Sequence, residues 1–417
     1  MRIALLNQPW SRTSVPIQKA DSVAIWTYEV ARRLAERHEV VVYGRWFPGQ
    51  PRAEERDGVR YERVDIEQPL ASVQKLVQRV KVRPVGSASG FYGIGYVLQL
   101  ACELAESDYD VVHVHNLSQY APVLRRLLPQ SALVLHMHCE WLSQIGRRSA
   151  EARLSRVDRV LGCSEYVRDR VATRFPELSD RCGVVHNGVD LASFGRNQPK
   201  PPPDPEGGTV LFVGRISPEK GVHDLLDAFA KLLRERPRAE LRVVGPYEPT
   251  PLDYIVGLSR EPSVRALSRF YSGNYLEQLK ARVDRDVLRQ VHFVGEVDRT
   301  HLAEEYRGAD VLVNPSLSEA FGMSLVEAMA SGVPVVATWV GGMSYVVEEG
   351  KEGILVPPAA PEALERAITR VLRDDELRTA LVERGLRSVE ERFTWRRISE
   401  QLCGEYARTL EARCDLS

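Results

Sequence analysis

The sequence predicts an α/β protein made of two doubly wound, Rossmann-like domains, and three observations indicate this. The chain has 417 residues, more than a single hydrophobic core usually supports. Short apolar runs alternate along it with segments whose apolar residues recur at helical spacing. A proline-rich stretch divides this alternating pattern into two halves.

In the first half, the apolar runs are rich in β-branched residues and show no polar alternation, which is typical of parallel strands buried on both faces. These runs lie at residues 2–6, 40–43, 111–114, 133–137 and 184–185. Between the first two runs, Trp26, Val30 and Leu34 form one apolar helical stripe. We therefore expect an N-terminal domain over residues 1–195.

The proline-rich stretch at residues 196–208 predicts an extended linker, because proline at this density joins neither a helix nor a central strand. Strand-like runs then resume at residues 210–213, 241–244, 292–294, 311–313, 333–336 and 354–356. A C-terminal domain is expected over residues 209–394. Ligands of such sheets bind beyond the carboxyl ends of the strands, so we expect both domains to face one central cleft.

Composition excludes several function classes. The 56 basic and 57 acidic residues give a net charge of -1, which argues against a dedicated nucleic-acid-binding protein. The six cysteines form no CxxC pair and no disulfide-framework spacing, which favours reduced thiols in the cytosol. The apolar run at residues 1–7 is too short for a signal peptide, and no run approaches the about 20 residues that span a bilayer. We expect a cytoplasmic protein.

The most informative segment is residues 314–334, which follows a predicted strand. A helix is expected from Ser324 to Ala330, so that Ala320, Phe321, Gly322 and Met323 form the turn whose N–H groups lie at its N-terminus, where phosphate binds well. Glu319 precedes this turn and Glu327 lies one turn inside the helix. Because carboxylates repel phosphate, we expect them to accept hydrogen bonds from sugar and ribose hydroxyls. The alternative is one loop carboxylate and one solvated helix residue.

The second segment is residues 214–221, directly after another strand. Arg215 and Lys220 place two cations at a strand-to-helix turn, where they can neutralise a departing diphosphate without a metal. The alternative is that both are surface charges.

Together these segments resemble glycosyltransferase family 4, whose members are retaining enzymes with the GT-B fold. The Glu-x7-Glu pattern of Glu319 and Glu327 is the most specific element, supported by residues 212–215, 220–221, 186–190, 308–310 and 332–337. The resemblance implies that the final segment, residues 395–417, returns to the N-terminal domain.

The resemblance also implies roles for individual residues. Glu319 would bind donor-sugar hydroxyls and act with His138 at the reacting centre, while Glu327 would bind the ribose. The donor diphosphate would contact Arg215, Lys220 and the turn from Gly322 to Leu325. The departing phosphate oxygen would help to take the acceptor proton, so no protein base is assigned.

One departure from the family pattern concerns the loop after the first strand. Many relatives have a Gly-Gly pair there, close to the donor phosphates, whereas residues 8–22 contain no glycine. Ser14, Lys19 and Ser22 are candidate substitutes. A second departure, residues 343–345, is expected to matter little.

Two His-x-His pairs, His113 with His115 and His136 with His138, lie near the ends of two predicted strands. Residues two apart on a strand face the same side, so a zinc site is an alternative to structural histidines. No cysteine or carboxylate stands at ligand spacing, so we expect no metal and only His138 to be functional.

Two further segments leave alternatives open. Residues 70–83 combine an apolar helical stripe with four cations, which allows weak association with the inner face of a membrane, although packing on the N-terminal domain is favoured. Residues 246–289 exceed the usual connection and carry five aromatic residues, which suggests an insertion serving the acceptor, a partner subunit or its own domain.

The expected function is transfer of a hexose-type sugar from a nucleotide-diphosphate donor to an acceptor hydroxyl. No other cofactor is expected. The alternatives are a GT-B-fold nucleotide-sugar epimerase and a nucleotide-sugar-binding module without catalysis. Neither the donor base, the acceptor nor the oligomeric state follows from the sequence.

Overall fold

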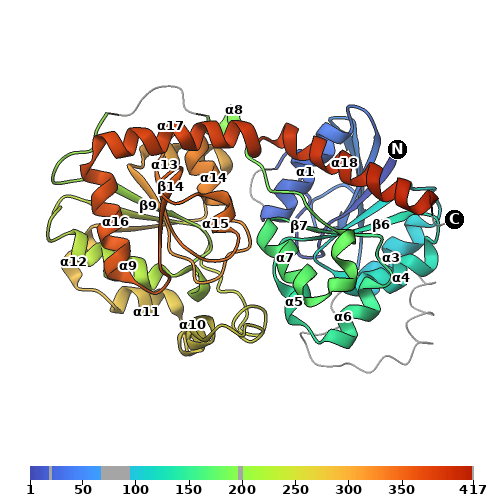
Figure 1. Ribbon diagram of the computed structural model, residues 1–417, viewed down its shortest axis with the longest axis horizontal. Helices are drawn as coiled ribbons and strands as arrows, with labels where there is room; N and C mark the ends of the chain where they lie inside the picture. Colours follow the sequence, from blue (N-terminus) through green and yellow to red (C-terminus); the bar gives the residue numbers. More distant parts are fainter. Residues whose placement is uncertain (18–20, 67–93, 196–200, 416–417) are drawn as a thin grey trace. The chain divides into compact units, whose positions relative to one another are not determined.

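The computed structural model describes residues 1–17, 21–66, 94–195 and 201–415 (Figure 1). The chain forms two compact units, Met1–His186 with Trp395–Ser417, and Asn187–Thr394. The first unit ends before residue 195 because the short helix α8 (Leu191–Phe194) packs against helices of the second unit. The basic segment at residues 70–83, Lys19 and part of the expected linker lie outside the described residues.

The first unit contains an eight-stranded sheet in the order β3-β4-β2-β1-β5-β6-β7-β8, parallel except for β3. Its strands are β1 (Arg2–Leu6), β2 (Glu39–Arg45), β3 (Ala53–Arg56), β4 (Val59–Val64), β5 (Val111–His115), β6 (Ala132–Met137), β7 (Arg159–Gly162) and β8 (Cys182–Val184). Four of the five predicted runs lie within strands, and the fifth, residues 184–185, overlaps β8 only at Val184. Three further strands were not predicted, because β3 is a charged edge strand, β4 alternates with charged residues and β7 is short.

Helices cover both faces of this sheet. They are α1 (Ser22–Leu34), α3 (Ile94–Leu104), α4 (Ala121–Leu127), α5 (Trp141–Gln144), α6 (Arg147–Leu154), α7 (Glu165–Arg174) and α18 (Trp395–Cys414). The C-terminal helix α18 packs against α1, and the buried rings of Trp26, Trp395 and Tyr406 share one core cluster. The last segment of the chain therefore helps to form the core of the unit that begins it.

The second unit contains six parallel strands in the order β11-β10-β9-β12-β13-β14. They are β9 (Thr209–Val213), β10 (Glu240–Val244), β11 (Val291–Gly295), β12 (Val311–Asn314), β13 (Val335–Thr338) and β14 (Gly353–Val356). All six predicted runs form strands. The fifth begins at Val335 rather than at Val333, because Pro334 has no N–H to donate to the ladder.

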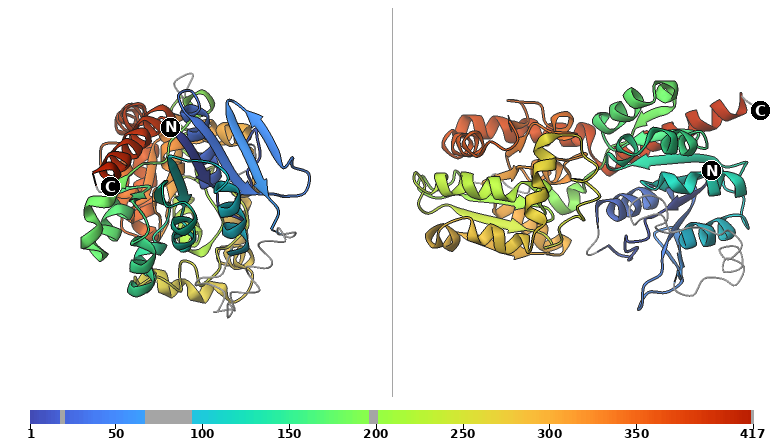
Figure 2. Two further views of the ribbon diagram at one scale, coloured as in Figure 1. Left: turned by 90° about the vertical axis from the view of Figure 1, so that its right-hand side faces the viewer. Right: turned by 90° about the horizontal axis from the view of Figure 1, so that it is seen from below.

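The second sheet lies between layers of helices (Figure 2, right). On one face α9 (Val222–Leu232) packs against α16 (Pro361–Arg373), and α13 (Arg299–Gly308) and α14 (Met323–Ala330) lie on the other (Figure 1). The remaining α-helices are α10 (Pro262–Arg265), α11 (Tyr275–Ala281), α12 (Arg285–Arg289), α15 (Met343–Val346) and α17 (Asp375–Arg392). No helix in the described ranges is long and apolar enough to cross a membrane.

The expected insertion at residues 246–289 folds onto its own unit. The Tyr275 hydroxyl lies 2.7 Å from Nδ1 of His223 on α9, and the ring of Phe270 packs against the same imidazole. Val264 and Leu267 also join the core of the second unit. Of the roles that the sequence left open for residues 246–289, the structure shows packing on their own domain.

Three buried histidines surround Trp26 in the first unit. The ring centroids of His113, His115 and His136 lie 5.3, 5.1 and 4.9 Å from that of Trp26. Burial lowers the pKa of all three imidazoles well below the ordinary 6.5, and repulsion from neighbouring histidines lowers it further. These side chains are neutral in the folded protein at neutral pH.

Acid should therefore destabilise the first unit through these histidines. In the unfolded chain each imidazole takes up a proton near pH 6.5, whereas in the folded chain it stays neutral, so stability is lost as the pH falls below about 6.5. Each such group contributes up to about 1.4 kcal/mol per pH unit to the slope. Urea unfolding at pH 7.5, 6.5 and 5.5 measures this slope, which His136→Gln should reduce.

Buried carboxyl groups act in the opposite direction, since burial raises the pKa of Glu103 to about 7 and that of Asp224 to about 6. Because the wild type and His136→Gln both contain these carboxyl groups, the difference between their slopes excludes the contribution of the carboxyl groups. His292→Gln, at a half-exposed position, should keep the wild-type slope. Equal slopes for wild type and His136→Gln would contradict the assignment.

Candidate active site

The predicted phosphate-binding residues lie at the carboxyl ends of two adjacent strands. β9 pairs with β12 in parallel, so the loops that follow them leave the same edge of the sheet. The first loop carries Arg215 and Lys220 and leads into α9, and the second carries Glu319 and leads into α14. This edge is also where the strand order changes direction, which is the usual ligand position in such sheets.

Backbone contacts lock the two loops together. The N–H of Leu317 donates to the carbonyl of Glu219 at 2.8 Å. Gly221 adopts the left-handed conformation with φ 68°, and a Cβ atom there would lie 2.0 Å from the carbonyl oxygen of Pro315. Only glycine fits this crossing, so it fixes where Lys220 points.

Lys220 and Glu319 form the ion pair at the centre of the candidate site. The Lys220 Nζ lies 2.6 Å from Oε2 of Glu319, with 17% and 16% of the two side chains exposed. Burial acts to raise the pKa of the Glu319 carboxyl, but the Lys220 ammonium outweighs it and lowers that pKa below its ordinary value. The nearby Arg215 guanidinium acts in the same direction. Glu319 is therefore ionised.

The turn before α14 matches part of the expected phosphate cradle. Gly322 is left-handed with φ 99° and precedes Met323, the first residue of the helix. The N–H of Leu325 donates to the carbonyl of Gly322 at 3.0 Å, so this N–H already has an acceptor within the chain. Within the described part of the chain, the N–H groups of Met323 and Ser324 have no backbone acceptor, and both remain candidates for phosphate.

Arg215 is held by a buried acidic residue, Glu219, whose role was not predicted from the sequence. The Glu219 carboxylate is fully buried and lies 3.4 Å from the Arg215 guanidinium. It also accepts hydrogen bonds from the hydroxyls of Ser217 and Thr250, the latter at 2.8 Å, and the Thr250 hydroxyl accepts one from Arg215. Glu219 stands between the two predicted cations in the sequence, which was a usable signal. Thr250 is distant in sequence and gave none.

Glu327 lies on α14 beyond the ion pair and is 8% exposed. Its Oε2 accepts a hydrogen bond from the Tyr306 hydroxyl at 2.8 Å. Burial raises the pKa of the Glu327 carboxyl, while Tyr306 and the cation of Arg299 partly oppose this. One carboxylate oxygen is thus already engaged by the protein. No contact between Glu327 and Lys220 or Glu319 is present among the described interactions.

His138 belongs to the first unit, where it follows β6. Its backbone N–H donates to Oδ1 of Asn116 at 2.6 Å, and its Nε2 lies 3.0 Å from Nδ1 of His115. The Thr27 hydroxyl donates to the carbonyl of Val23, so it accepts from Nε2 of His115 at 3.1 Å. Nδ1 of His115 then carries no proton and accepts a hydrogen bond from the Nε2–H of His138, which fixes the His138 tautomer.

A nitrogen from each of His113, His115 and His136 lies within 4.8 Å of the others, the spacing of a possible metal group in the described ranges. Protein groups already bind one nitrogen of each ring, namely Tyr406, Thr27 and the carbonyl of Val185. The rings also enclose Trp26, and the group contains no anionic ligand to balance a cation. This arrangement favours the structural interpretation of these histidines.

The glycine-free loop of the first unit leads into α1. The Asp21 carboxylate caps this helix by accepting the N–H groups of Val23 and Ala24 at 3.0 and 3.1 Å. These donors are therefore satisfied within the chain, and an anionic side chain occupies the helix start.

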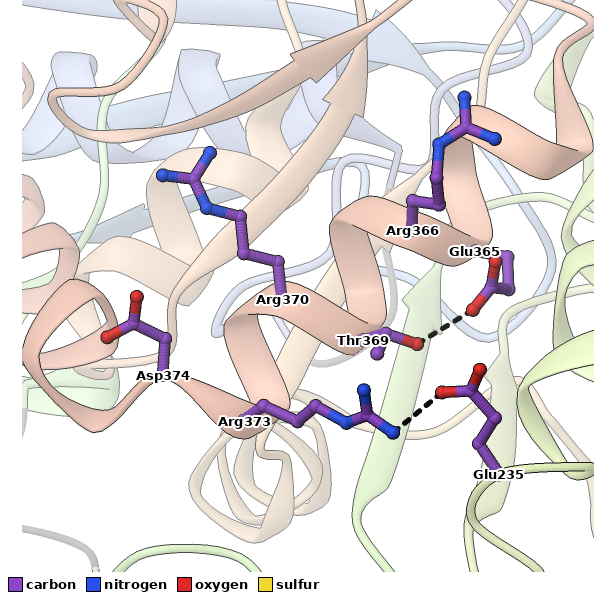
Figure 3. Close-up of a pocket in the computed structure, with 7 residues that line it drawn as sticks. All are labelled: Glu235, Glu365, Arg366, Thr369, Arg370, Arg373 and Asp374. Atoms are coloured by element: carbon purple, nitrogen blue, oxygen red, sulfur yellow. Dashed lines mark hydrogen bonds and ion pairs between the residues drawn. The ribbon is translucent and has the colours of Figure 1, made fainter.

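A hollow of about 410 Å³ opens beside α16 of the second unit (Figure 3). Arg373 pairs with Glu235 at 2.8 Å, and the Thr369 hydroxyl donates to Glu365, also at 2.8 Å. Its lining contains none of the predicted site residues. The mixed and partly paired charges indicate a solvated surface groove rather than the active site.

Comparisons with known proteins identify the family to which the chain belongs. Residues 23–193 match the family model described as Glycosyltransferase Family 4, and residues 194–388 match that described as Glycosyl transferases group 1. The chain is 30% identical to a phosphatidyl-myo-inositol mannosyltransferase from Mycolicibacterium smegmatis, over 73% of this chain and 72% of that protein. It is 26% identical to spore coat protein SA from Bacillus subtilis, over 97% and 99% of the two chains.

Solved structures match in fold over nearly the whole chain. A sucrose-phosphate synthase from Thermosynechococcus elongatus aligns with a TM-score of 0.72 at 23% identity, covering 99% of this chain and 100% of that one. Anabaena HepE in complex with UDP and glucose aligns with a TM-score of 0.66 at 19% identity, covering 98% and 100%. The two parallel-sheet units therefore have the GT-B architecture of glycosyltransferases. The chain belongs to glycosyltransferase family 4.

The close contact between the two loops at Gly221 should contribute to the stability of the second unit. Gly221→Ala should lower the free energy of unfolding by more than the about 1–2 kcal/mol that a left-handed alanine costs, because its methyl group meets the Pro315 carbonyl. Gly350→Ala is the matched control, since Gly350 has φ 73° but no atom within 4 Å of the added Cβ. Urea unfolding of both variants tests this, and equal losses would contradict the locking of the loops.

Proposed function

We propose that this glycosyltransferase moves a hexose-type sugar from a nucleoside-diphosphate donor to an acceptor hydroxyl with retention of configuration. The observation that carries the proposal is the Lys220–Glu319 ion pair at the start of α14, beside Arg215. The cations and helix N–H groups there suit the diphosphate of such a donor. The carboxylate suits the hydroxyl groups of its sugar.

The ion pair suggests how the donor binds. A diphosphate at the start of α14 supplies anionic oxygens that compete with Glu319 for Lys220. Arg215, held on its other side by Glu219, keeps part of its side chain exposed and offers a second cation. Glu319 is then available to accept hydrogen bonds from sugar hydroxyls, and Glu327 to accept them from ribose.

The reaction follows from this charge arrangement. The bond between the anomeric carbon and the phosphate oxygen breaks, and the acceptor oxygen forms its bond to that carbon on the same face. The acceptor proton passes to the departing phosphate oxygen, so the step requires no protein base. Lys220 and Arg215 stabilise the charge that develops on the diphosphate, and no metal is needed for this. His138 is proposed to contact the donor sugar or the acceptor.

The comparisons support a transferase over the two alternatives. HepE is described in complex with UDP and glucose, and the enzymes named above are a mannosyltransferase and a synthase. A thermal-shift screen with UDP-, GDP- and ADP-linked sugars identifies the donor, because a ligand that binds only the folded state raises its stability. Isomerised sugar without acceptor would instead indicate the epimerase, and binding without turnover the binding module.

Lys220→Ala and Glu319→Ala should each abolish sugar transfer while the fold survives. The first variant loses the cation that neutralises the leaving group, and the second loses the sugar-binding carboxylate. Transfer is measured as nucleoside diphosphate released with the donor found in the screen, and folding by circular dichroism. Lys231→Ala is the matched control, since Lys231 pairs with Glu362 at the surface of α9 and should keep wild-type activity. Full activity of either site variant would reject the assignment.

A further inference from the structure

A chain of hydrogen bonds runs from His138 to helix α1 within the first unit. Nε2 of His138 lies 3.0 Å from Nδ1 of His115, and Nε2 of His115 lies 3.1 Å from the hydroxyl oxygen of Thr27. His138 is partly exposed, whereas His115 and Thr27 are buried, with 0% and 1% of their surfaces accessible. The chain thus connects a predicted catalytic residue with a helix residue that the proposed function does not use.

Thr27 sets the direction of this chain. Its hydroxyl group donates its single hydrogen to the carbonyl of Val23 at 2.8 Å, so its oxygen accepts from His115. Burial lowers the pKa of the His115 imidazole well below 6.5, so this ring is neutral and its one proton is on Nε2. Nδ1 of His115 then accepts a hydrogen bond from the Nε2–H of His138. In a neutral His138, the nitrogen without a proton is therefore Nδ1.

The backbone of His138 is held separately from its ring. Its N–H donates to Oδ1 of Asn116 at 2.6 Å, and Nδ2 of Asn116 donates to Oε1 of Gln8 at 2.9 Å. Asn116 is buried and adopts the left-handed conformation with φ 57°. These bonds do not use the side chains of His115 or Thr27. A change in the chain should therefore alter the proton on the His138 ring and leave the position of its backbone unchanged.

We propose that Thr27 and His115 are positioning residues for sugar transfer, because they make Nδ1 of His138 a hydrogen-bond acceptor for a substrate hydroxyl group. This inference rests on the proposed function, in which His138 contacts the donor sugar or the acceptor. The reacting hydroxyl gives its proton to the departing phosphate oxygen. The partner of Nδ1 is therefore another hydroxyl group of the donor sugar or the acceptor, one that donates its hydrogen to the ring.

Removing the Thr27 hydroxyl should reverse the chain. In Thr27→Val the buried Nε2–H of His115 has no acceptor, and an unpaired buried donor is costly. If this proton moves to Nδ1 of His115, it can donate to Nε2 of His138, which then carries its own proton on Nδ1. His138 would present a donor in place of an acceptor to the substrate hydroxyl. We expect kcat/KM for transfer to fall by about tenfold, the effect of one lost hydrogen bond.

Two measurements on the full chain test this. Long-range ¹H–¹⁵N spectra of protein labelled at its histidine rings show which ring nitrogen carries the proton, and His138→Gln identifies the resonances of His138. The wild type and Thr27→Ser should show the proton on Nε2, and Thr27→Val should show it on Nδ1. Transfer, measured as for Lys220→Ala, should fall by about tenfold in Thr27→Val and stay within about twofold of wild type in Thr27→Ser.

A matched control and a double variant separate positioning from stability. The buried Thr409 hydroxyl on α18 likewise donates to the carbonyl four residues earlier, that of Glu405, and among the described interactions Thr409 contacts no histidine. Thr409→Val should therefore keep wild-type transfer. In a His138→Ala background, Thr27→Val should cause no further loss, because Thr27 acts through that ring.

Calorimetric titration distinguishes the two sources of the hydroxyl group. If Thr27→Val weakens binding of the nucleotide sugar but not of its nucleoside diphosphate, the hydroxyl belongs to the donor sugar. If both bind as in the wild type while transfer falls, it belongs to the acceptor.

Three outcomes contradict the positioning role alone: a wild-type His138 with its proton on Nδ1, unchanged transfer by Thr27→Val, or a loss in Thr27→Val that multiplies with that of His138→Ala. A wild type that transfers sugar from no donor would overturn the proposed function, and the positioning role with it. The ring spectra need no substrate, so they decide the direction of the chain in either case.

Discussion

The locking of the loops after β9 and β12 is the constraint on which the candidate site depends. A backbone hydrogen bond from Leu317 to Glu219 and the close approach of Gly221 to Pro315 leave little freedom at the crossing. As a result, Nζ of Lys220 in the first loop lies 2.6 Å from Oε2 of Glu319 in the second. Two charged side chains from distant parts of the sequence thus form one largely buried ion pair. Without the fixed loops, the free-energy cost of removing both charges from water would favour their separation.

The two cations of the site have counter-ions of different kinds. Arg215 faces Glu219, which is fully buried and bound by two hydroxyls, so this carboxylate is a permanent part of the framework. Lys220 faces Glu319, which retains some exposure and lies at the start of α14 where an anion is favoured. We propose that a donor diphosphate takes the place of the second carboxylate but not of the first. We infer that the fixed pair positions the site and the exchangeable pair responds to the ligand.

The strands and the charged motif residues were predictable from the sequence because both depend on local patterns. Each of the eleven predicted apolar runs overlaps a parallel strand, since strands buried on both faces need continuous apolar sequence. The edge strand β3 was missed because its residues AEER carry no such signal. Thr250 and Tyr306 were not predicted as neighbours of the site residues, because their contacts connect segments far apart in the chain. The left-handed geometry of Gly221 likewise becomes meaningful only beside Pro315.

The most direct measurement of the central claim is a crystal structure of the protein with its preferred nucleoside diphosphate bound. We expect phosphate oxygens within hydrogen-bonding distance of the Lys220 ammonium and of the N–H groups of Met323 and Ser324, with the Glu219–Arg215 contact unchanged. This expectation would be contradicted by phosphates bound elsewhere on the second unit while the Lys220–Glu319 pair remains closed and excluded from the ligand.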